Sequence, residues 1–359
     1  MNGGWRSLPD LAGRLLGGGV VAANDEFFGA ADHLLAAEPP RFDPAAFGPK
    51  GKLYEGWETR RRREPGEDHA TVRLGAPGIV RGVVVDTAFF TGNYPPYASV
   101  EGCAVAGYPS PAELDGAPWT TLVPRSPLRG DTRNEFDVDV PYRFTHVRLR
   151  IYPDGGVARL RVHGEVVPDP ALLHGRRFDL AALANGALVV DCSDRFYGAP
   201  GNLLVPGPAR SMGEGWETAR RRDGGNDWVV VRLAAPGRIR LAELDTSHFK
   251  GNAPGAAQLR GVDARTGDPA DPDGWFGLLP RTRLQPDTRH RFPVAGARTA
   301  THVRLDIFPD GGMARLRLSG KVSRPELAAL ADRLSRLAPP VARSEPVERL
   351  PQSGRPVVG

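Results

Sequence analysis

One stretch of sequence occurs twice in this chain, and a duplicated sequence folds as two copies of one structural unit. Gly56-Trp57-Glu58-Thr59 returns 159 residues later as Gly215-Trp216-Glu217-Thr218, and an arginine run follows in both places. The order of matches holds to the end of the unit, where the Pro-Asp-Gly-Gly sequence at 153–156 returns at 309–312. The 359-residue chain therefore has room for two tandem domains of about 130 residues each.

Each copy is patterned for β-strands. Val147, Leu149 and Ile151 alternate with arginines, the period of a strand with one face in water. The Pro-Asp-Gly-Gly sequence supplies a turn, and Leu160 and Val162 resume the alternation. These features predict a hairpin that closes each domain.

The segments outside the repeats are short. Leucines at helical spacing predict a helix over 324–338, and a second short helix is expected near 9–16. The Pro-rich, polar sequence from 339 onward is typical of a disordered tail. The expected division is an N-terminal segment, a first repeat, a second repeat joined to it near 170–185, and a C-terminal helix with its tail, at 1–20, 21–170, 185–321 and 322–359.

Composition excludes several classes of protein. The 47 Lys and Arg nearly balance the 42 Asp and Glu, for a net charge of +5, so a nucleic-acid partner is not expected. No run of about 18 apolar residues occurs, so no membrane span is expected. Cys103 and Cys192 form no CxxC pair, which favours a reducing compartment and a cytoplasmic protein.

The order of features along each repeat points to a fold. A Gly-Trp pair opens the repeat, an apolar strand and a Val-rich strand follow, a second Trp comes later, and an arginine-rich segment ends it. This order resembles the galactose-binding-like (discoidin-like) β-sandwich, a jelly roll of about eight strands. The expected fold class is all-β, with two tandem jelly-roll sandwiches.

Longer strings resemble one enzyme family, the allantoicases. They are Asn-Asp-Glu-Phe-Phe at 24–28, Gly-Trp-Glu-Thr-Arg-Arg-Arg-Arg at 56–63, the segment 85–95 with its second copy at 245–252, and the segment 152–162. The resemblance covers residues 8–320. It implies a bimodular enzyme of purine breakdown that hydrolyses allantoate to ureidoglycolate and urea, and that forms homo-oligomers. His69 against Trp228, and Arg60 against Ala219, argue for unequal roles of the two copies.

A substrate with one carboxylate and two ureido groups calls for arginines, because the guanidinium binds a carboxylate bidentately. In a strand, alternate members of an arginine run would face opposite sides, so at most half of each run could share one pocket. A solvated basic face, or partners for the neighbouring glutamates, is an equal alternative. The candidate substrate-binding residues are Arg60, Arg61, Asn93, Arg220, Arg221, Lys250 and Asn252.

Candidate acids and bases also occur in both copies. Glu58 and Glu217 each follow a tryptophan, and an aromatic wall can raise a carboxyl pKa, although each could simply bind a neighbouring arginine. Asp86 and Asp245 end Val-rich strands, where they could accept ureido N–H bonds or cap their own turns. His248 stands where the first copy has phenylalanine, and it could move the proton that loss of urea requires or be structural. His146 and His302 are expected to be structural, and His163 to lie at the surface.

The sequence contains few of the patterns that are typical of metal sites. HExxH, HxH and CxxC patterns are absent, and Asp271 and Asp273 approach a calcium loop that Trp275 interrupts. No cofactor or metal ligand is therefore expected, and use of a divalent ion such as manganese stays open. The competing functions are a non-catalytic small-molecule or sugar-binding sandwich and a related enzyme that cleaves ureidoglycolate.

Overall fold

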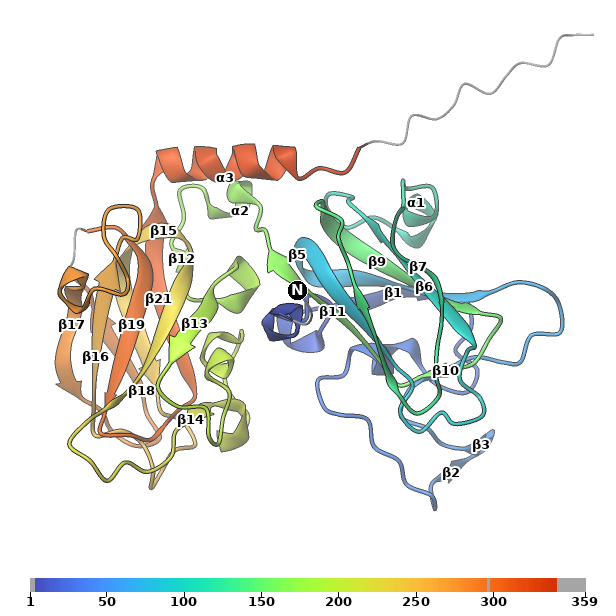
Figure 1. Ribbon diagram of the computed structural model, residues 1–359, viewed down its shortest axis with the longest axis horizontal. Coiled ribbons are helices and arrows are strands. Elements are labelled where there is room, and N and C mark those ends of the chain that lie inside the picture. The colour runs from blue at the N-terminus through green and yellow to red at the C-terminus, as the bar shows by residue number, and fades with distance from the viewer. Residues whose placement is uncertain (1–3, 296–297, 341–359) are drawn as a thin grey trace, which may run out of the picture.

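The computed structural model describes residues 4–295 and 298–340, and within them antiparallel strands form two domains that lie side by side (Figure 1). The tail expected from 339 onward lies outside the described residues from 341. The strands of the first domain are β1 (Gly19–Ala23), β2 (Phe47–Gly48), β3 (Gly51–Lys52), β4 (Trp57–Glu58), β5 (Asp68–Asp86), β6 (Tyr97–Cys103), β7 (Thr120–Pro127), β8 (Arg133–Asp137), β9 (Arg143–Tyr152), β10 (Gly156–Val157) and β11 (Arg159–Val166).

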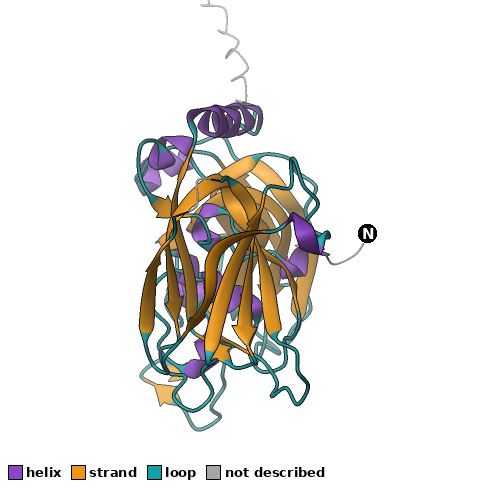
Figure 2. Ribbon diagram, turned by 90° about the vertical axis from the view of Figure 1, so that its left-hand side faces the viewer, coloured by secondary structure: helices purple, strands orange, loops and turns teal. Residues whose placement is uncertain are grey.

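The second domain repeats this order. Its strands are β12 (Phe178–Asp179), β13 (Leu188–Cys192), β14 (Trp216–Glu217), β15 (Asp227–Asp245), β16 (Ala256–Val262), β17 (Phe276–Arg283), β18 (Arg289–Pro293), β19 (Ala300–Phe308), β20 (Gly312–Met313) and β21 (Arg315–Val322). Each domain is a sandwich, and Figure 2 shows the strands of the nearer, second domain running from top to bottom of the view. The predicted all-β class with two tandem β-sandwiches is confirmed.

A single long strand belongs to both sheets of each sandwich. The first part of the 19-residue β5 pairs with β1 and β9, and β6 and β7 extend that sheet. The last part of β5 pairs with β8 and β11 in the opposite sheet. In the second domain β15 does the same, with β13 and β19 at one end and β18 and β21 at the other.

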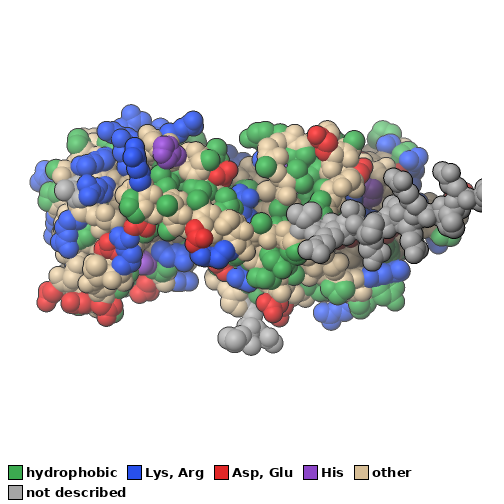
Figure 3. All heavy atoms as spheres, turned by 90° about the horizontal axis from the view of Figure 1, so that it is seen from above, with side chains coloured by type: hydrophobic (Ala, Val, Ile, Leu, Met, Phe, Trp, Pro, Cys, Tyr) green, Lys and Arg blue, Asp and Glu red, His purple; other side chains and the backbone are tan. Residues whose placement is uncertain are grey.

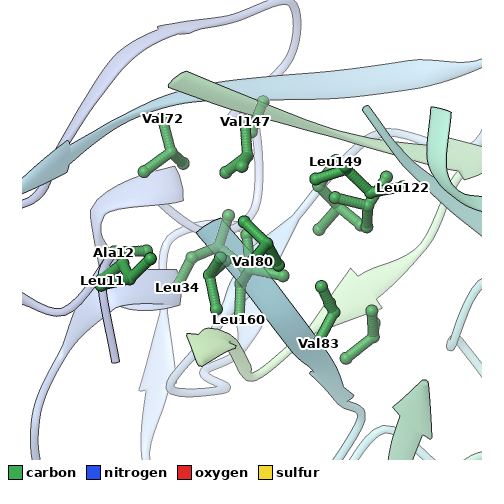
Figure 4. Close-up of a cluster of buried hydrophobic side chains, with 14 of the residues drawn as sticks. Leu11, Ala12, Leu34, Val72, Val80, Val83, Leu122, Val147, Leu149 and Leu160 are labelled. Atoms are coloured by element: carbon green, nitrogen blue, oxygen red, sulfur yellow. The ribbon is translucent and has the colours of Figure 1, made fainter. Parts of the chain in front are cut away.

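The core lies between the two sheets. Val72, Val147 and Leu149 from one sheet meet Val83 and Leu160 from the other, all fully buried (Figure 4). Burial of each such side chain contributes about 1.5–3 kcal/mol, so the alternating apolar positions determine which face of every strand points inward.

The predicted closing hairpin is wrong. Strands β9 and β11 do not pair with each other, because both pair with β5 and they lie in opposite sheets. The Pro-Asp-Gly-Gly segment crosses from one sheet to the other, and β10 leaves it to pair with β4. Alternation and a turn sequence are equally compatible with a hairpin and with such a crossover, so the pattern could not separate the two.

The helix predicted over 324–338 is confirmed as α3 (Arg324–Arg336), whereas the helix predicted near 9–16 is wrong. Only a 3-10 turn, Arg14–Leu16, forms there, because the Leu11 amide bonds to the carbonyl of Val162 and Leu11 enters the first core. The other helical elements are α1 (Pro111–Asp115), α2 (Pro170–Leu173), and the 3-10 turns Gly4–Ser7, Ala31–Leu35, Leu183–Asn185, Pro200–Leu204, Met212–Glu214 and Pro272–Gly274.

Helix α3 lies across the top of the molecule and connects the two domains (Figure 1). It continues from β21 of the second domain, and the carbonyl of Leu337 accepts a 2.8 Å bond from the amide of Arg143 in the first. Seen from above, basic side chains gather over the second domain and apolar ones over the middle of the molecule (Figure 3). Among the described residues, no helix is long and apolar enough to cross a membrane.

Candidate active site

Glu58 and Asn93 come together in the first domain, where the amide Nδ2 of Asn93 donates a 2.6 Å hydrogen bond to Oε1 of Glu58. The short pairing of β4 with β10 places Glu58: the neighbouring Trp57 is buried, and Glu58 points the opposite way and is partly exposed. The backbone carbonyl of Asn93 accepts a 2.8 Å hydrogen bond from the amide of Gly156, and this bond fixes the position of Asn93. Any side chain at Gly156 would overlap the Phe90 ring, so the glycine keeps this turn close.

The surroundings of Glu58 change its acidity. Burial raises the pKa of this carboxyl above its usual value, and the hydrogen bond from Asn93 opposes part of that rise. A carboxyl with a raised pKa holds a proton closer to neutral pH and can donate it to a leaving group.

The same pair forms in the second domain, where Asn252 Nδ2 donates a 2.6 Å bond to Oε1 of Glu217. Asn252 also lies 3.4 Å from the sulfur of Met212, and its carbonyl accepts a bond from Gly312. The structure thus brings together Glu58 with Asn93 and Glu217 with Asn252, each pair in its own domain. The first pair lies beside β10 and the second at β14, both labelled in Figure 1.

Asp86 and Asp245 end the long strands β5 and β15 and are buried. Each accepts a hydrogen bond from the backbone amide two residues on, Ala88 at 2.9 Å and Ser247 at 2.8 Å. Both carboxylates therefore cap the turn that follows their strand.

His248 lies in that turn in the second domain, with a left-handed backbone (φ 73°). Phe89 has the same conformation in the first domain (φ 68°). In both domains an aspartate side chain accepts a hydrogen bond from the backbone amide of this residue. Nε2 of His248 bonds at 2.9 Å to the carbonyl of Ala209, and the side chain is exposed. Lys250, two residues on, is also exposed.

The arginine runs lie in loops after β4 and β14, so the alternation expected of a strand does not apply to them. Arg60 binds Asp25 at 2.7 Å, and Arg221 binds both Asp223 and Asp227 at 2.8 Å. Arg61 and Arg220 are exposed and form no ion pair within the described part of the chain.

Sequence reasoning missed the buried arginines at the start of β11 and β21. Arg159 is 1% exposed, and its guanidinium donates to the carbonyls of Glu38 and Glu55 and to the Glu55 carboxylate. Arg315 makes the matching bonds to the carbonyls of Gly207 and Glu214. The Ala-Arg-Leu sequence shared by the two copies was the available signal, but strand alternation alone does not show that loop carbonyls cover this position.

The histidines occupy different environments. His146 is buried, with Nδ1 2.9 Å from Oγ1 of Thr145, and burial lowers its pKa to about 4. His302 makes the same contact with Thr301, and burial lowers its pKa too. His163 is partly buried rather than at the surface, and its Nδ1 lies 2.8 Å from the carbonyl of Leu8.

Metal ligands do not cluster in the described chain: no three His, Cys, Asp or Glu side chains there come together as a metal site requires. Asp271, which approached a calcium-loop pattern, instead caps a 3-10 turn by accepting the amide of Asp273 at 3.0 Å.

Comparisons with known proteins agree on one family. A family model described as "Allantoicase repeat" matches residues 9–167 and 178–323. A "Probable allantoicase" of Nocardia farcinica is 60% identical over 322 residues, 89% of this chain and 96% of that protein. One of Streptomyces coelicolor is 53% identical over 90% of this chain and 88% of that protein. The crystal structure of allantoicase from Saccharomyces cerevisiae superimposes with a TM-score of 0.73 at 35% identity, covering 87% of this chain and 92% of that one.

Proposed function

The chain belongs to the allantoicase family, and we propose that it hydrolyses allantoate to ureidoglycolate and urea. The observation that carries this proposal is the match of the family repeat to both domains, together with a Glu–Asn pair that each domain builds in the same way.

The chemistry of the reaction calls for an acid. Attack of water on a urea carbonyl would give a carbamate, whereas the family's products are ureidoglycolate and urea. Loss of urea from the central carbon followed by addition of water gives these products. The departing urea nitrogen must then be protonated by a nearby acid.

Glu58 fits the role of that acid. Its carboxyl is partly buried, its pKa is raised, and Asn93 occupies Oε1. Oε2 accepts no hydrogen bond from the described part of the chain, which leaves it available to a substrate nitrogen. Glu217 would perform the same step if the second domain were the active one.

Two arginines and two asparagines among the candidate residues would bind the substrate. Arg61 and Arg220 are the arginines of the two runs still available for its carboxylate, because Arg60 and Arg221 are held by aspartates. The side-chain oxygens of Asn93 and Asn252 can accept ureido N–H bonds. We further propose a cytoplasmic homo-oligomer.

The direct test is to incubate the purified chain with allantoate, with and without manganese, and to measure urea and ureidoglycolate. We expect one urea per allantoate, and no cleavage when ureidoglycolate is supplied instead. Cleavage of ureidoglycolate would identify the related enzyme. Binding of allantoate without release of urea would identify a binding protein. A size-exclusion and light-scattering measurement of mass tests the oligomer.

A further inference from the structure

A cavity of about 290 Å³ lies where the two domains meet. The first domain contributes Asp10, Arg133, Arg161 and His163 to its wall, and the second contributes Leu183 and Val205. This interface cavity is of the size that small-molecule sites have. It includes neither member of the Glu58–Asn93 or the Glu217–Asn252 pair.

Two arginines in the interface cavity lack partners that their counterparts have. Nη1 of Arg161 is buried without a hydrogen bond, and the nearest carboxylate oxygen, Oδ2 of Asp10, is 3.6 Å away. The side chain of Arg133 forms no hydrogen bond or ion pair within the described part of the chain. The carboxylate of Glu135, on the same strand as Arg133, is bonded to Arg6.

In the second domain, a glutamate carboxylate lies beside the matching pair of arginines. Arg289 and Arg317 stand there at the places of Arg133 and Arg161, and Arg289 binds the carboxylate of Glu243 at 2.6 Å. Glu243 is the cross-strand neighbour of Arg317, as Val84 is of Arg161.

The aspartates of this face match in the two domains, but the glutamate stands on a different strand: the first domain has Val84 and Glu135 where the second has Glu243 and Arg291. Asp86 lies opposite Arg133 in the ladder as Asp245 lies opposite Arg289, and Asp10 corresponds to Asp179. The first domain therefore carries its glutamate on β8, where Arg6 binds it, and has no carboxylate beside Arg161 at the position that Glu243 occupies beside Arg317. A buried guanidinium nitrogen without a hydrogen bond is costly, and a bound anion would offset that cost at Nη1 of Arg161.

We propose that the interface cavity binds a small organic carboxylate, which Arg133 and Arg161 hold in place of the carboxylate that Glu243 supplies in the second domain. Asp10 adds a second recognition element. Its Oδ1 accepts the amides of Ala12 and Val162, while Oδ2 faces Arg161 without a hydrogen bond. A ligand that carries N–H donors beside its carboxylate suits this wall, so the ligand class is a ureido acid. That choice of class rests on the proposed function, whereas the carboxylate site itself does not.

Isothermal titration calorimetry on the full chain tests the proposal with two probes, ureidoacetate and its neutral amide, ureidoacetamide. We expect ureidoacetate to bind and the amide to bind at least about tenfold more weakly, since a charge-assisted bond to arginine is lost. Arg133→Gln, a change at an exposed side chain, should weaken ureidoacetate binding about tenfold or more. The matched control is Arg289→Gln, which should leave it within about twofold.

A second variant fills the site. Val84→Glu supplies the carboxylate of the second domain and should abolish binding of ureidoacetate, provided that thermal unfolding remains cooperative. Equal affinity for the two probes, no binding to the unmodified chain, or an equal loss in Arg133→Gln and Arg289→Gln would each overturn the proposal.

The same preparations are assayed for release of urea from allantoate. Arg133-dependent binding without release of urea would support the carboxylate site and contradict the proposed function. Release of urea without Arg133-dependent binding of ureidoacetate would support the proposed function and contradict the carboxylate site.

Discussion

The side-chain amide of Asn93 holds one oxygen of the Glu58 carboxylate at 2.6 Å, and the bond is made by residues 35 positions apart in the sequence. Asn252 and Glu217 repeat the bond at the same distance and the same separation in the second domain. A duplication that preserves such a pair preserves the backbone around it: the short strand that carries the glutamate, and the glycine turn that fixes the asparagine.

Replacement of Glu58 tests the assignment of the acid. Glu58→Gln keeps the size of the side chain and an acceptor for Asn93 but removes the proton donor. We expect kcat to fall by about a hundredfold or more, because loss of a positioned acid typically costs that much, with an almost unchanged melting temperature.

The matched control for Glu58 is Glu217→Gln in the second domain. We expect this variant to keep kcat within about tenfold of the unmodified chain, since burial raises the pKa of Glu58 and favours the first domain as the proton donor. The reverse order of effects would move the chemistry to the second domain.

Removal of the Asn93 amide should displace the pH profile. A general acid works only while protonated, so kcat falls as pH rises through the pKa of Glu58. The bond from Asn93 lowers that pKa, and Asn93→Ala should therefore move the alkaline limb of the kcat profile to higher pH. If the alkaline limb of the kcat profile stays in place or moves to lower pH, ionisation of Glu58 does not cause that limb.

For His248, the sequence and the structure favour different roles. Its position in only one copy favoured proton transfer, but Nε2 bonds to the carbonyl of Ala209 and the ring is exposed. We expect His248→Ala to change kcat less than about tenfold and to cost about 1 kcal/mol of stability through the lost hydrogen bond. A hundredfold fall in kcat with unchanged stability would restore the histidine as the proton carrier and displace Glu58.

His146 should make the protein sensitive to acid. Burial lowers its pKa from 6.5 to about 4, so the native state excludes a proton that the unfolded chain binds. Its contribution to stability is present above pH 6.5 and is lost as pH falls toward 4. The loss is on the order of 3 kcal/mol.

Urea denaturation across that pH range measures the effect of His146. The slope of unfolding free energy against pH should be shallower in His146→Gln than in the unmodified chain. His302→Gln, at the matching position of the second domain, should flatten it less, because His302 is more exposed than His146. An unchanged slope in His146→Gln would show that His146 takes up its proton in the native state as well.

The sequence by itself determined the duplication, the all-β class and the helix at α3. These follow from local signals: repeated strings, alternation of apolar residues along each strand, and leucines at helical spacing. It also singled out Glu58 and Asn93, because both recur at fixed places in the second copy, although nothing local showed that they touch.

Only the tertiary structure decided which strands pair and which charges lie together. Strand β5 turns from one sheet into the other, so the two alternating segments on either side of Pro-Asp-Gly-Gly belong to opposite sheets. Arg159 is buried because distant loop carbonyls cover it. The interface cavity joins Asp10, Arg133 and Arg161 to residues of the second domain. Contacts between residues so far apart depend on how the sheets pack, and no local pattern encodes them.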